Sequence, residues 1–184
     1  MDRNIIHAPI IEKEIESLQA GDVVYLSGTI LTGRDAAHKR LIQLIREGKP
    51  LPVDIRNQAI YYVGPCPAKP GQIIGACGPT TSGRVDVFTP ALLELGLKAM
   101  IGKGQRSAEV IQAIVRNKAI YLAATGGAGA LIAQCVKKAE VIAFHDLGTE
   151  AIHRLEVENF PLIVAIDTTG NDLYRIGPKQ FARP

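Results

Sequence analysis

Long apolar runs, an excess of one charge and nucleotide-binding fingerprints are all missing from this chain of 184 residues. No apolar run approaches the roughly 20 residues that cross a bilayer, and the first residues do not lead into a signal-peptide core. We therefore expect a cytoplasmic protein with no membrane partner. The net charge is only +3, and Lys and Arg alternate with Asp and Glu along the chain. This pattern argues against nucleic acid as a partner.

The cysteines and histidines also lack the spacing of a metal site. Cys66, Cys77 and Cys135 stand far apart with no Cys-x-x-Cys pair, and the four histidines are equally dispersed. This spacing argues against a disulfide framework and against a self-contained zinc or iron–sulfur site. A cluster held by these three cysteines alone stays open as an alternative. We expect this chain to supply no metal ligand.

What the chain does contain is a regular alternation of strand and helix patterns, in a composition that is 47% apolar and 21% charged. We predict strands at 23–31, 59–63, 98–101, 119–123, 141–144 and 162–166, and helices at 11–18, 35–46, 89–95, 107–115 and from a glycine turn to 136. Residues 173–184 are predicted to be a polar tail. The sequence therefore predicts an α/β fold in a single domain over 1–184 with no internal repeat.

Residues 78–84, Gly-Pro-Thr-Thr-Ser-Gly-Arg, carry the strongest chemical signal. Pro and Gly fix and then free the backbone, and hydroxyl residues such as Thr80 cap helices or form short hydrogen bonds. Arg84 adds a planar fork that suits a carboxylate. The segment is either a plain helix N-cap with a surface arginine or part of a ligand site.

Three cationic residues lie where predicted elements end, which favours the second interpretation. Arg34 follows a strand, Arg84 follows the Thr-Thr-Ser turn, and Lys103 lies between two glycines after another strand. Ligand sites of α/β sheets gather at strand ends and in the loops beyond them. Each residue alone could be a solvated surface charge. Together they predict a site for a small polyanion such as a dicarboxylate.

His38 lies one helical turn after Arg34 on the same predicted helix face. We expect it to help orient Arg34 rather than to contact substrate. Asp35 and Lys39 are spaced as a surface ion pair on another face.

The glycine turn at 126–129 follows a predicted strand, but its spacing is not that of a dinucleotide fingerprint and no Walker-type lysine follows. It is either a tight helix–strand turn or a helix N-terminus that binds a carboxylate.

Segments 32–39, 78–84, 102–104 and 150–167 together resemble the beta subunit of iron–sulfur hydro-lyases, the class I fumarase and tartrate dehydratase family. The likeness covers nearly the whole chain, in the order of the carboxy-terminal domain of single-chain class I fumarases. It implies a three-layer β/β/α swivelling domain. It also implies a partner alpha subunit, in an alpha2beta2 assembly, that ligates the [4Fe-4S] cluster in place of this chain.

The activity implied by the resemblance is the reversible hydration of fumarate to (S)-malate. Arg34, Arg84 and Lys103 match the residues that hold the substrate carboxylates, and Thr80 matches the proposed catalytic base. A threonine hydroxyl is a poor base at neutral pH, so helix capping stays open as the alternative role of Thr80.

Segment 32–38 favours the fumarase branch, with L-tartrate dehydratase as the alternative. A second alternative is a module that binds an organic anion without catalysis, and a third is a structural protein.

Overall fold

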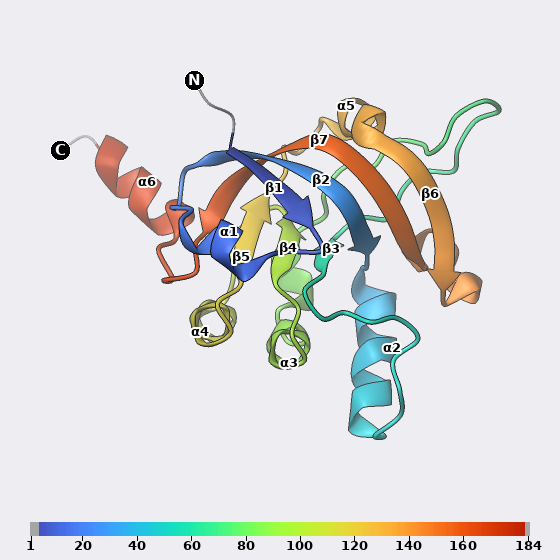
Figure 1. Ribbon diagram of the computed structural model, residues 1–184, viewed down its shortest axis with the longest axis horizontal. Helices are drawn as coiled ribbons and strands as arrows, with labels where there is room; N and C mark the ends of the chain where they lie inside the picture. The colour runs from blue at the N-terminus through green and yellow to red at the C-terminus, as the bar shows by residue number, and fades with distance from the viewer. Residues whose placement is uncertain (1–3, 183–184) are drawn as a thin grey trace.

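The computed structural model describes residues 4–182, whose strands form one seven-stranded sheet (Figure 1). In chain order the strands are β1 (Asn4–Ala8), β2 (Val23–Thr32), β3 (Ala59–Tyr61), β4 (Ala99–Gly102), β5 (Ile120–Ala123), β6 (Val136–Ala143) and β7 (Ile152–Ile166). The helices are α1 (Glu12–Glu16), α2 (Asp35–Arg46), α3 (Thr89–Glu94), α4 (Ala108–Arg116), α5 (Gly129–Cys135) and α6 (Leu173–Phe181), with 3-10 helices η1 (Ser82–Val85) and η2 (His145–Glu150). The predicted mixed α/β architecture is confirmed.

The sheet combines a parallel half with one long antiparallel strand. Strands β1 to β5 run parallel to their neighbours in the order β1-β2-β3-β4-β5. Strand β7 runs antiparallel to β5, β2 and β6. Because β7 bonds both β5 and β2, the sheet closes on itself. In Figure 1, β7 is the long orange-red strand that arches over the shorter β4 and β5.

Two hydrophobic cores lie on opposite faces of the parallel strands. The first fills the inside of the closed sheet, with buried side chains such as Leu26, Ile101 and Leu155. The second packs the outer face of β3, β4 and β5 against α2, α3 and α4. Tyr61 belongs to the first core and Tyr62 to the second, since successive residues of an extended chain point to opposite faces.

Helix α2 spans Asp35–Arg46, as its sequence pattern predicts. Ala37, Leu41 and Ile42 recur at helical spacing and are buried in the outer core. The helix starts directly after β2, so its first turn lies at the carboxyl end of that strand.

Strands β6 and β7 correct the prediction for the last third of the chain. The helix expected to run to residue 136 ends at Cys135, and β6 already begins at Val136. The strand expected at 162–166 begins ten residues earlier, at Ile152. Both errors have one cause: the two segments are strands because they pair with each other, and β7 also pairs with β2, which is distant in sequence.

The predicted polar tail contains a helix. Residues Leu173–Phe181 form α6, whose N-cap Asp172 accepts a hydrogen bond from Tyr174 N at 3.0 Å, and none of its residues is buried. Residues 183–184 of that predicted tail, and residues 1–3 at the start, lie outside the described residues. Within 4–182, no helix is both long and apolar enough to span a bilayer.

Candidate functional site

The parallel strands bring two of the predicted cations to one edge of the sheet. Thr32 of β2 lies opposite Tyr61 of β3, which in turn lies opposite Ile101 of β4. Parallel neighbours in this register end at the same edge, where the loops that follow them meet. Arg34 lies two residues beyond the end of β2, and Lys103 directly follows β4. The strand-end prediction for these two residues is therefore matched by the topology.

The segment that carries Thr80 and Arg84 is fastened to the same edge through its backbone. Thr80 N donates to Tyr62 O at 2.8 Å, and Lys103 N donates to Thr80 O at 3.2 Å. Ser82 N then donates to Lys103 O at 2.9 Å, and Thr81 and Lys103 form a parallel bridge. Thr80 and Lys103 thus lie on adjacent backbone segments, and η1 begins two residues after Thr80.

The Thr80 hydroxyl does not cap a helix. The N-cap of η1 is Thr81, and no side chain forms a capping hydrogen bond there. Instead, Thr80 Oγ1 donates to Tyr62 O at 2.7 Å. The capping alternative for Thr80 is therefore wrong. Because the hydroxyl proton is taken by a carbonyl, the oxygen keeps its lone pairs for a ligand or a proton.

Arg84 forms an ion pair with Asp35, whose predicted partner was Lys39. Its Nε donates to Asp35 Oδ1 at 3.0 Å, and both side chains remain partly open to solvent. The predicted pair between Asp35 and Lys39 is absent among the described residues. This contact joins η1 to the first turn of α2, so it draws the two arginine-bearing segments together.

Arg34 is the more enclosed of the two arginines. Its Nη2 lies 3.6 Å from Glu150 Oε1, while its Nε is buried and has no hydrogen-bond partner within residues 4–182. A Cβ at Gly64 would lie 2.7 Å from Arg34 Nη1, so the glycine makes room for the guanidinium. The second carboxylate oxygen of Glu150 accepts from Ala36 N at 2.9 Å.

Lys103 is exposed, and no hydrogen bond or ion pair holds its ammonium group in the part of the chain that the structure describes. Two glycines shape its surroundings. A Cβ at Gly102 would lie 2.1 Å from Ser82 Oγ, and Gly104 has a φ of 85°. The turn after β5 also approaches this lysine, because a Cβ at Gly126 would lie 3.8 Å from Lys103 Nζ. Lys103 is therefore a cation available to a ligand.

His38 lies behind Arg34, fully buried in the outer core. Its Nδ1 donates to the Arg34 carbonyl oxygen at 2.8 Å, so it contacts the backbone of Arg34 and not the guanidinium. The rings of Tyr62 and Phe88 flank the imidazole at centroid distances of 5.3 and 6.4 Å. Burial lowers the pKa of His38 to about 4, so the ring is neutral at pH 7.

The cysteines do not fit the ligand set of an iron–sulfur cluster. Among residues 4–182, no three His, Cys, Asp or Glu side chains gather as a metal site. Cys66 is exposed and Cys77 is buried, with Cys135 between these extremes. Burial, together with Cys135 and Cys66, raises the pKa of the Cys77 thiol to about 11. A thiol with this pKa is neutral at pH 7, whereas iron binds thiolate.

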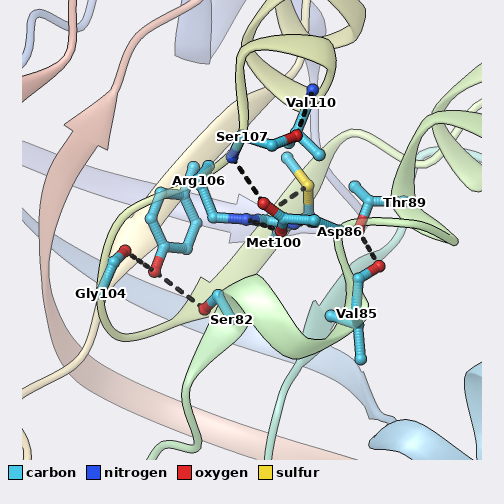
Figure 2. A network of polar contacts seen from close by, with 10 residues as sticks. Ser82, Val85, Asp86, Thr89, Met100, Gly104, Arg106, Ser107 and Val110 are labelled. Carbon is cyan, nitrogen blue, oxygen red and sulfur yellow. Dashed lines mark hydrogen bonds and ion pairs between the residues drawn. The ribbon is translucent and has the colours of Figure 1, made fainter.

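A buried polar network behind η1 has no counterpart among the predicted residues (Figure 2). The Arg106 guanidinium bonds Asp86 and Thr89 in the outer core, and the Tyr121 hydroxyl bonds Gly104 O. Arg106 follows a glycine turn and precedes a helix, where arginine is normally exposed. The sequence therefore carries no sign that this residue is buried.

Comparison with known proteins adds independent information. Residues 2–177 match the sequence model of the family described as Fumarase C-terminus. The chain is 42% identical over 160 residues to "Fumarate hydratase class I, anaerobic" of Escherichia coli (strain K12), which covers 85% of this chain and 29% of that protein. It is 38% identical over 168 residues to "Fumarate hydratase 1, mitochondrial" of Leishmania major, covering 90% and 31%.

A shorter relative matches almost end to end. The chain is 36% identical over 185 aligned residues to "L(+)-tartrate dehydratase subunit beta" of Escherichia coli (strain K12), covering 98% of this chain and 90% of that subunit. The chain thus spans about three-tenths of the length of the two fumarate hydratases and nine-tenths of the tartrate dehydratase subunit. The match to the family model over residues 2–177 shows that this chain belongs to the Fumarase C-terminus family.

Proposed function

We propose that this chain is the beta subunit of a hydro-lyase that hydrates fumarate reversibly to (S)-malate. One observation carries the proposal: Arg34, Arg84, Lys103 and the Thr80 hydroxyl all lie at the carboxyl edge of the parallel strands. Relatives named fumarate hydratase and tartrate dehydratase subunit beta support the reaction class. The three cations are the substrate-binding residues of the proposal, and Thr80 is its catalytic residue.

The chemistry gives each cation a task. A dicarboxylate carries two charges, and removing the proton beside a carboxylate places further negative charge on that group. Two arginine forks orient the carbon skeleton, and a third cation stabilises the added charge. Arg84 and Arg34 already contact the carboxylates of Asp35 and Glu150, so substrate carboxylates would replace these contacts. Lys103, with no such contact among the described residues, is free to meet the developing charge.

The Thr80 hydroxyl can act as the catalytic base only with help from a neighbouring group. Its hydroxyl donates to Tyr62 O, and the lone pairs of its oxygen are left for the proton beside the substrate carboxylate. An activating partner is required, because a neutral hydroxyl is a weak base. We place Arg84 in this role, since it lies four residues after Thr80 and its positive charge favours the deprotonated oxygen.

In this proposal, the partner subunit holds the cofactor, and the two kinds of subunit form one complex. A [4Fe-4S] cluster would act as a Lewis acid on the substrate hydroxyl. The described residues of this chain do not fit as its ligands, so the alpha subunit would hold it. The proposed assembly is a cytoplasmic alpha2beta2 complex in which residues 1–184 form one three-layer β/β/α swivelling domain. The two cores on opposite faces of the sheet support the layering.

L-Tartrate dehydration is the second candidate, because the tartrate dehydratase beta subunit matches this chain over 98% of its length. The test is anaerobic co-expression with the alpha subunit, cluster reconstitution, and an absorbance assay of fumarate formation from malate, with tartrate run in parallel. Turnover of malate supports the fumarase assignment, and turnover of tartrate alone replaces it. An intact, cluster-loaded complex that turns over neither substrate overturns both. Tight dicarboxylate binding by the isolated chain would then favour the binding module.

The Arg84→Ala variant tests the site within that complex. We expect kcat/KM to fall by about a hundredfold to a thousandfold, because a charge-assisted clamp on a carboxylate is lost. Arg116→Ala is the matched control. Arg116 is an exposed, ion-paired arginine at the end of α4, and α4 begins after β4 and returns to the opposite edge of the sheet. Equal losses in the two variants would contradict the site.

A further inference from the structure

The C-terminal end of η1 is anchored by a buried arginine (Figure 2). Asp86 directly follows η1, and its Oδ1 accepts from Arg106 Nε at 2.6 Å while its Oδ2 accepts from Ser107 N at 2.5 Å. Arg106 Nη2 donates to Thr89 Oγ1 at 2.9 Å, and this hydroxyl donates to Val85 O at 2.9 Å. The Arg106 side chain has no exposed surface. The last residue of η1 and the residue after it are therefore both held.

The N-terminal end of η1 is anchored by a buried tyrosine. The Tyr121 hydroxyl donates to Gly104 O at 2.9 Å, so its 2.8 Å contact with Ser82 Oγ is accepted from the serine. Ser82 is the first residue of η1, and Gly104 directly follows Lys103. One hydroxyl thus sets the distance between the helix that carries Arg84 and the loop that carries Lys103.

Arg106 joins the two anchors. Its guanidinium lies over the Tyr121 ring at 4.9 Å and over the Tyr62 ring at 5.4 Å. Tyr62 is also the residue whose carbonyl oxygen accepts the Thr80 hydroxyl. A buried ion pair adds little net stability compared with apolar residues of similar volume. The contacts of Arg106 therefore reach the backbone segments that carry Thr80, Arg84 and Lys103.

We propose that Arg106 and Tyr121 are positioning residues that hold Thr80, Arg84 and Lys103 in one fixed arrangement for substrate. This inference rests on the proposed function. Neither residue touches substrate. They act through η1 and the Lys103 loop, and misplacement of such groups by about 1 Å can cost a hundredfold in rate.

A double-mutant cycle in the alpha–beta complex tests this inference. Tyr121→Phe removes one hydroxyl and leaves the ring, and Arg84→Lys keeps the charge but loses the fork. We expect Tyr121→Phe to lower kcat/KM about tenfold alone, and about twofold or less in the Arg84→Lys background, because both changes damage the same arrangement. A lower folded fraction would instead lower kcat/KM by the same factor in both backgrounds.

Tyr61→Phe is the matched control. Its hydroxyl is also buried and donates to a backbone carbonyl, that of Cys77 at 2.6 Å, but the ring lies in the inner core against Phe160, and no hydrogen bond or ring contact among the described residues joins it to η1. We expect its effect to be the same factor with and without Arg84→Lys. Arg106→Lys is the second test variant, because lysine keeps the charge and cannot bond Asp86 and Thr89 through one planar fork.

Amide hydrogen exchange of the free, full-length chain gives a readout that needs no activity. In Tyr121→Phe and Arg106→Lys, we expect amides of 81–85 and 103–104 to exchange about tenfold faster, with those of α2 unchanged. Unchanged exchange in η1 overturns the inference, and so do independent, multiplying losses in the cycle. A wild-type complex that hydrates nothing removes the proposed function instead, and exchange still reports whether these two residues anchor η1.

Discussion

Helix η1 has an arginine–aspartate pair on each side, and the two pairs differ in burial. The pair between Arg84 and Asp35 leaves 55% and 34% of the side chains exposed, with Nε 3.0 Å from Oδ1. The pair between Arg106 and Asp86 leaves 0% and 12% exposed, with Nε 2.6 Å from Oδ1. An ion pair exposed to water is weak and easily replaced. Removing one member of a buried pair costs much more free energy, because the other charge is left buried without a partner. The exposed pair suits a place where a ligand competes, and the buried pair suits a fixed support.

Removing Arg106 tests the buried side of this comparison and should have the largest effect. We expect Arg106→Met to lower the free energy of unfolding by about 3–5 kcal/mol, because the mostly buried Asp86 is left charged without its cation. Adding Asp86→Asn should recover part of that loss. Urea denaturation at pH 7 measures both changes.

The control for this variant is Arg116→Met, which breaks the exposed pair with Glu94. Its expected cost is below about 1 kcal/mol. Similar losses for Arg106→Met and Arg116→Met would show that burial does not separate the two kinds of pair in this protein.

His38 sharpens the comparison, because it is a buried base that stays neutral where Arg106 stays charged. Burial lowers the pKa of His38 to about 4 from 6.5. Between these values the unfolded chain binds a proton that the folded chain does not, so stability falls as the pH falls. From pH 7 to pH 4, we expect His38 to contribute about 3 kcal/mol to the loss.

His38→Gln keeps an N–H donor for the Arg34 carbonyl and does not titrate. Denaturation at several pH values should therefore show a shallower acid loss in this variant than in the wild type. Parallel stability curves for the two proteins between pH 6.5 and 4 would contradict a buried neutral imidazole.

Local patterns were enough to predict the parts of this fold that depend on near neighbours. Helix α2 has Ala37 and Leu41 at helical spacing, and its bounds agree with the prediction. Strand β7 carries exposed Glu156 between buried Leu155 and Val157, an alternation that was missed in its first ten residues. These ten residues pair with β2 and β6, and pairing with distant strands cannot be read from a short window of sequence.

The site shows the same division. Arg34 and Lys103 could be placed together in advance, because the carboxyl ends of parallel strands meet at one edge. Arg106 could not, because its burial depends on Asp86, 20 residues earlier in the chain. The partner of Asp35 was predicted one helical turn away, at Lys39, and lies 49 residues away, at Arg84. Local spacing predicts which residues reach the edge, and the folded chain decides which charges meet there.

A methyl group at Gly102, in β4, should disturb the contact between Ser82 and Tyr121. Its Cβ would lie 2.1 Å from Ser82 Oγ and 2.9 Å from Tyr62 Cδ2, so the serine must leave Tyr121. We expect Gly102→Ala to cost about 1–3 kcal/mol in thermal or urea unfolding, as overpacked cores do. Gly83→Ala is the control, since a Cβ at Gly83 would lie 3.6 Å from Gln105 O, an ordinary van der Waals contact. A neutral Gly102→Ala variant would show that Ser82 is not held.

Asp35→Asn tests the exposed pair and should have the smallest effect on stability, below about 1 kcal/mol. Its value lies in the assay of the complex. If a substrate carboxylate replaces Asp35 at Arg84, removing this competitor should lower KM by up to about fivefold, the equivalent of an exposed ion pair. Glu47→Gln, which removes a carboxylate paired with exposed Lys49, should leave KM unchanged. A higher KM in Asp35→Asn would mean that Asp35 orients Arg84 for substrate, which would make the exposed pair a support like the buried one.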